Sequence, residues 1–147
     1  MRPGVRLGLD PGSVRVGVAV SDGDGILASP RDSLPVGPDT LEVIAALVRD
    51  LNAMEVVIGL PLGMSGAEGA SATKTREWAT RLAGHIDVDV RLVDERLSTV
   101  QAQRSYREQG RSTRVTRNRI DSAAAGVVLQ FTLDAERASG QAPGEVL

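Results

Sequence analysis

The sequence contains no cysteine and few aromatic residues, and both absences limit what the protein can do. Without cysteine it has no disulfide, no thiolate metal ligand and no cysteine nucleophile, a composition that fits a cytoplasmic protein. Trp78, Tyr106 and Phe131 are its three aromatic residues, which argues against a nucleic-acid surface built from many stacked rings. We therefore expect any nucleic acid to be bound through charge, metal ions and backbone groups.

Long hydrophobic runs are also missing. The longest uncharged apolar stretch, residues 122–133, is shorter than the roughly 20 residues that cross a bilayer. Asp10 and Arg15 interrupt the region where a secretion signal would need an apolar core, so we expect no membrane partner. The 147 residues, 41% hydrophobic and 24% charged, suit one globular domain, which we place at 1–138 before a flexible tail at 139–147.

Positive charge is scarce overall but concentrated in one segment. The net charge is −2, yet residues 91–119 contain eight arginines against three acids. The arginine fork matches phosphate oxygens, so this segment is a candidate phosphate-binding surface. A solvated, arginine-rich helix surface is the alternative.

The hydrophobic pattern predicts three short strands, then alternating helices and strands. The predicted strands are residues 5–10, 14–21, 26–29, 55–60 and 88–93, with a proline-rich loop at 30–38. The predicted helices are one capped by Asp39 or Thr40 with apolar positions from Leu41 to Leu51, one at residues 70–84, one beginning at Ser98, and a final amphipathic helix from Ile120, preceded by a basic loop at 110–116. This order predicts an α/β fold: a mixed five-stranded sheet with helices on both faces. Trp78 has the spacing of a core residue.

Three carboxylates occupy positions that are typical of a site. Asp10 ends the first predicted strand, Glu95 follows the fifth, and Asp121 lies in the first turn of the last helix. Ligands of open α/β sheets gather at the carboxyl ends of strands. Three converging carboxylates would repel one another, and an all-oxygen set of ligands suits Mg²⁺ or Mn²⁺. Two such ions can promote hydrolysis of a phosphodiester.

Each carboxylate also has a purely local explanation, which the spacing leaves open. Asp10 could cap the turn that follows it, Glu95 could pair with Arg96, and Asp121 could favour its helix N-terminus. The glycine-rich residues 63–69 could hold a phosphate or could be a plain connection, since they lack the signature of a P-loop.

Four segments in register resemble the YqgF/RuvX family. They are residues 8–22 (GLDPGSVRVGVAVSD), 59–62 (GLPL), 94–99 (DERLST) and 121–130 (DSAAAGVVLQ). The resemblance runs from about residue 5 to 133. It implies an RNase H-like fold and a nuclease that processes the 5′ end of pre-16S rRNA or resolves Holliday junctions. It also implies that Asp10, Glu95 and Asp121 are the catalytic, metal-binding acids.

The nucleic-acid contacts expected from charge are eight arginines: Arg15 and Arg96 near the acids, and Arg104, Arg107, Arg111, Arg114, Arg117 and Arg119 in the basic segment. Precursor rRNA and branched DNA remain alternative partners. A monomer would suffice to trim one RNA end, whereas cleavage of both strands of a junction favours a two-fold homodimer. A non-catalytic ribosome-associated module and a relative of sugar-kinase or actin-like ATPases are the other hypotheses. The latter needs two facing domains, and this chain supplies one.

Overall fold

The computed structural model describes residues 1–98 and 120–147. The elements are β1 (Arg6–Pro11), β2 (Arg15–Ser21), β3 (Ala28–Pro35), α1 (Thr40–Leu51), β4 (Glu55–Leu60), α2 (Ala70–Ala83), β5 (Asp89–Asp94), a 3-10 turn (Glu95–Ser98), α5 (Ala123–Ser139) and β6 (Glu145–Val146). The helix expected after Ser98, the loop at 110–116 and the six arginines between 104 and 119 lie outside the described residues. No described helix is long and apolar enough to cross a bilayer.

The strands form one mixed sheet in the order β3-β2-β1-β4-β5-β6. The three central strands β1, β4 and β5 are parallel, and the other neighbouring pairs are antiparallel. Parallel strands end at the same edge of a sheet, so the ends of β1 and β5 bring Asp10 and Glu95 to one side. The predicted mixed sheet is confirmed, but the prediction of five strands is wrong by one.

The extra strand comes from the segment that was expected to be a tail. Glu145 and Val146 pair with Leu92 and Arg91 of β5. Gly144 makes this possible because its φ is +83° and a Cβ there would overlap the carbonyl oxygen of Leu92. Two residues are too short for a hydrophobic period, which is why the pattern gave no signal.

The third strand also differs from its prediction. It covers residues 28–35 instead of 26–29 and so includes Pro30 and Pro35. Prolines argued for a loop because they cannot donate a ladder hydrogen bond. As β3 is the edge of the sheet, those missing donors cost nothing on its open side.

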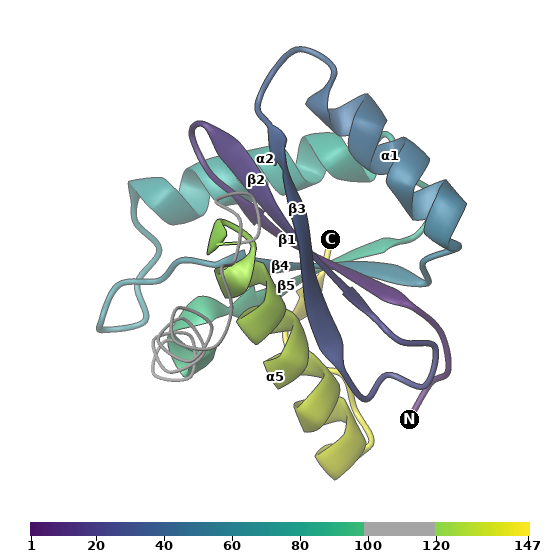
Figure 1. The fold of residues 1–147 in the computed structure, drawn as a ribbon. Coiled ribbons are helices and arrows are strands. Elements are labelled where there is room, and N and C mark those ends of the chain that lie inside the picture. The colour runs from purple at the N-terminus through teal and green to yellow at the C-terminus, as the bar shows by residue number, and fades with distance from the viewer. Residues whose placement is uncertain (99–119) are drawn as a thin grey trace.

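Helices cover both faces of the sheet (Figure 1). One apolar core packs α1 and α2, through Ile44, Val48 and Leu82, against β-strand residues such as Leu9 and Ile58. The second core lies under α5 and is built from seven buried residues: Ala19, Val57, Val93, Ala125, Val128, Leu129 and Leu133. Among the described helices, α5 is the one that packs on this face, with its N-terminal end close to the ends of the central strands.

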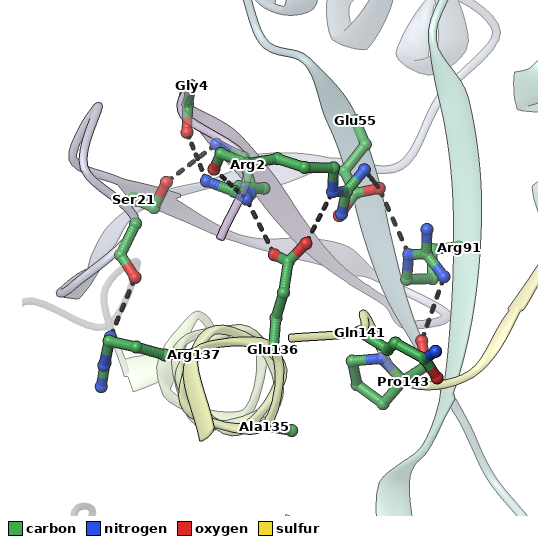
Figure 2. Close-up of polar contacts among 12 residues, drawn as sticks. Arg2, Gly4, Ser21, Glu55, Arg91, Ala135, Glu136, Arg137, Gln141 and Pro143 are labelled. Carbon is green, nitrogen blue, oxygen red and sulfur yellow. Dashed lines mark hydrogen bonds and ion pairs between the residues drawn. The ribbon is translucent and has the colours of Figure 1, made fainter. Parts of the chain in front are cut away.

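Buried charges join α5 to the start of the sheet at the opposite end of the helix. Glu136 of α5 is 3% exposed and pairs with Arg2 (2.6 Å) and with the buried Arg6 (2.8 Å). Glu55, at the start of β4, pairs with Arg2 and with Arg91 of β5. Figure 2 shows Glu136 reaching from the helix to Arg2, with Glu55 and Arg91 beyond it. These ion pairs fix the end of α5 that lies away from the carboxylates.

Candidate active site

Asp10 and Glu95 lie together at the edge where β1 and β5 end. Both side chains are partly buried and line the same pocket, which has a volume of about 560 Å³. Burial, reinforced by the negative charge of Glu95, raises the pKa of Asp10 to about 6. Burial also raises the pKa of Glu95. Two half-buried carboxylates, one of which opposes the ionisation of the other, are an electrostatic arrangement that a divalent cation relieves.

Asp121 lies on the other side of Asp10. It is two residues before α5 rather than in its first turn, because the helix begins at Ala123. Asp10, Arg15 and Asp121 line a second cavity of about 350 Å³. Arg15 Nε lies 3.6 Å from Asp121 Oδ2 and donates a 2.7 Å hydrogen bond to Ser33 Oγ.

Asp10 therefore belongs to both cavities, with Glu95 on one side and Asp121 on the other. Across residues 1–98 and 120–147, no three acidic or histidine side chains are close enough to form a ready-made metal site. The structure pairs Asp10 with Glu95 and places Asp121 beside Asp10, with 45% of its side chain exposed. Their roles as metal ligands stay a prediction.

The backbone before α5 is fastened to β2 directly opposite Asp10. Gly17 is the strand partner of Asp10, and a Cβ at Gly17 would overlap the carbonyl oxygen of Asp121. The next contact is a buried hydrogen bond of 2.9 Å from the Val18 N–H to Ser122 Oγ, where β2 changes register against β3. A missing side chain on β2 is thus what lets Asp121 approach Asp10.

We expect Gly17→Ala to displace Asp121 and to weaken the fold. The added methyl group must push the start of α5 away from β2, and such overpacking typically costs about 1–3 kcal/mol. Thermal unfolding and a cleavage assay measure the two effects. Gly37→Ala is the matched control because nothing lies within 4 Å of its added Cβ. Equal melting temperatures for the two variants would show that the close packing of Asp121 on Gly17 does not constrain the position of Asp121.

Arg96 is engaged with its own protein in this structure. It pairs with Asp94 (2.7 Å) and donates to the carbonyl oxygens of Gly63 and Met64, both at 3.2 Å. The arginine thereby holds the loop after β4 beside the end of β5. A contact from Arg96 to nucleic acid stays a prediction, as it does for Arg15.

One wall of the main pocket was not predicted from the sequence. Ser71, Lys74, Trp78 and Arg81 of α2 line it together with the acids. Their spacing of three, four and three residues puts them on one face of the helix. Trp78 does pack against the core as expected, but it also lines the pocket. The available signal was that the chain's single lysine and single tryptophan share one helical stripe.

Known proteins match this chain over nearly its whole length. A family model described as RuvX, Holliday junction resolvase, matches residues 4–135. Relatives from Nocardioides sp. and Thermobifida fusca, each with the provisional name pre-16S rRNA nuclease, are 47% and 50% identical. In both comparisons the alignment covers 100% of this chain and 98% of the relative.

Among solved structures, Thermus thermophilus RuvC in complex with a Holliday junction substrate has a TM-score of 0.58. It is 14% identical, and the alignment covers 97% of this chain and 99% of that one. This similarity shows a shared fold, which is RNase H-like as expected. Together with the full-length sequence matches, it places the chain in the RuvX family.

Proposed function

We propose that the protein is a divalent-metal-dependent nuclease that hydrolyses phosphodiester bonds in structured nucleic acid, most specifically at the 5′ end of pre-16S rRNA in the cytoplasm. The observation that carries this proposal is the pair Asp10 and Glu95, half-buried at the ends of parallel strands with raised pKa values. The names of the relatives, which are nearly half identical, support the choice of substrate.

The residues present fit Mg²⁺ or Mn²⁺. Hard divalent cations prefer oxygen ligands, and Asp10, Glu95 and Asp121 supply carboxylate oxygens; the sequence has no cysteine, and no described histidine lines either cavity. When bound, two such ions would activate water and stabilise the departing oxygen. Asp10 would hold the metal together with Glu95 from one cavity and Asp121 from the other, because it lines both cavities.

The neighbouring residues would position the substrate. Arg15 is held by Ser33 Oγ at the mouth of the cavity that contains Asp121, where its remaining donors can contact a phosphate. The turn at Gly12 and Ser13 lines the main pocket, so its backbone groups lie in the same pocket as Asp10 and Glu95. The arginines between 104 and 119 would extend the contact along the nucleic acid.

Cleavage of four-way DNA junctions is the second candidate. The family model is described as Holliday junction resolvase, and the RuvC neighbour was solved with a junction. A resolvase would need two copies of the site related by two-fold symmetry, whereas trimming of rRNA needs one.

The decisive experiment compares two substrates under three metal conditions. Purified protein is incubated with a pre-16S rRNA fragment and with a four-way junction, in Mg²⁺, in Mn²⁺ and in EDTA. We expect the rRNA to be cut with either metal and to stay intact in EDTA. Cleavage of the junction alone would favour the resolvase, and binding of rRNA without cleavage in any metal would overturn the nuclease.

A further inference from the structure

The wall of the main pocket formed by α2 has a chemistry that the acids do not explain. Lys74 and Arg81 are exposed, seven residues apart on the same helix face, and both line the pocket. Asp10 and Glu95 belong to the same lining. The pocket therefore combines carboxylates suited to cations with basic side chains from α2.

These two basic side chains are not used to stabilise the fold. Among the described residues, neither Lys74 nor Arg81 has a carboxylate partner. Arg76, on the same helix but outside the pocket, instead pairs with Glu68 and Glu145. The basic groups that face the pocket thus remain available for a phosphate, which favours cationic partners.

Trp78 lies between them along the helix face. It packs against the core, and it lines the pocket as well. A fixed indole beside two phosphate-binding groups is the combination that holds a nucleic-acid strand without base pairing. The carboxylate of Glu77, also in the lining, opposes free phosphate but can accept hydrogen bonds from the amino groups of a base.

We propose that this α2 wall is a binding subsite for an unpaired nucleotide next to the phosphodiester that is cut. The indole of Trp78 contacts the base, and Lys74 and Arg81 contact the flanking phosphates. A volume of about 560 Å³ is within the range of small-ligand pockets. The proposal rests on the nuclease function proposed above and specifies its substrate: the strand must be single-stranded beside the cleavage point.

Because Trp78 is the only tryptophan, its fluorescence reports on this subsite alone. The protein in Mg²⁺ is titrated with a single-stranded hexanucleotide, with the corresponding duplex and with inorganic phosphate. We expect saturable quenching by the single strand and no change with phosphate. Equal affinity and equal quenching by the duplex would overturn the requirement for an unpaired base.

Variants separate base contact from charge, and their affinities are compared by the fluorescence anisotropy of a labelled hexanucleotide because the Trp78 variants lack the tryptophan signal. We expect Lys74→Ala and Arg81→Ala each to weaken binding of the hexanucleotide several-fold, and Trp78→Leu to weaken it about tenfold, whereas Trp78→Phe retains most of the affinity. Arg49→Ala is the matched control, because Arg49 is an exposed arginine of α1 that also has no carboxylate partner among the described residues. Melting temperatures verify that each variant is folded, and unchanged affinity in the folded Lys74, Arg81 and Trp78→Leu variants would overturn the subsite.

The same preparation is assayed for cleavage of precursor rRNA, so the two proposals can fail separately. Cleavage without any change in Trp78 fluorescence overturns the subsite and leaves the nuclease intact. Quenching without cleavage supports the subsite and overturns the nuclease.

Discussion

Replacing Asp10 by asparagine is expected to lower the rate of nucleic-acid cleavage by about 1,000-fold. The substitution removes the one carboxylate among the described residues that lines both cavities and that we propose as a metal ligand; loss of such a ligand removes several kcal/mol of transition-state stabilisation. The rate is measured under single-turnover conditions in Mg²⁺ and in Mn²⁺. Asp50→Asn, an exposed residue of α1, is the control and should cleave like the unaltered protein.

The same substitution should change how the fold responds to metal and to pH. Ligand binding raises the melting temperature, so Mn²⁺ should stabilise the unaltered protein and stabilise Asp10→Asn much less. Without metal, the pKa of Asp10 is raised from 3.8 to about 6, so the folded state favours the protonated acid. Its ionisation therefore lowers the free energy of unfolding as pH rises from about 4 to 6, by at most about 3 kcal/mol.

Asparagine carries no charge, so the variant should lose that part of the pH dependence and be the more stable protein above pH 6 in EDTA. Denaturant unfolding at pH 4, 5, 6 and 7 measures the difference. The placement of Asp10 in the site is wrong if the variant shows the same Mn²⁺ stabilisation and the same pH profile as the unaltered protein.

Glu136→Ala is expected to give the largest loss of stability in the described part of the chain. The substitution removes the carboxylate that pairs with Arg2 and leaves the buried guanidinium of Arg6 without its charge partner. Removal of one partner from a buried ion pair typically costs about 3–5 kcal/mol. For a chain of this length that corresponds to a melting temperature lower by roughly 10 °C.

A second acid on α5 separates burial from charge. Asp134 pairs with Arg137 on the same helix, and both side chains are largely exposed. Such surface pairs contribute about 0–1 kcal/mol, so Asp134→Ala should leave the melting temperature nearly unchanged. A similar small change for Glu136→Ala would mean that water replaces the lost carboxylate and that the network is not a fixed anchor of α5.

The central part of the fold could be predicted because its elements obey simple periods. The apolar run at 55–60 became β4 without any change of boundary, and the helix expected after a cap at Asp39 or Thr40 begins at Thr40, with Asp39 as its N-cap residue. The pattern failed at both edges of the sheet. An edge strand is hydrogen-bonded on one side, so β3 tolerates Pro30 and Pro35. At the other edge, two residues are enough to pair with β5 and form β6.

The candidate site could be predicted only where strand ends determine positions. Asp10 and Glu95 were brought together by parallel strands, as expected from the pattern. The approach of Asp121 depends on Gly17, and no periodicity reveals which strand a distant helix will touch. The α2 wall was missed because Trp78 has the sequence spacing of a core residue. Spacing does not show that such a residue can also line a cavity.

The short β6 strand has a consequence for self-association. Without it, the whole outer edge of β5 would present unpaired amide and carbonyl groups beside Val90 and Leu92, and such an edge recruits strands from other molecules. The pairing of Glu145 and Val146, fastened by the contacts of Arg91 with Pro143 and of Arg76 with Glu145, occupies that edge. Removing the last few residues would therefore expose a template for intermolecular sheet extension and make the protein prone to aggregate.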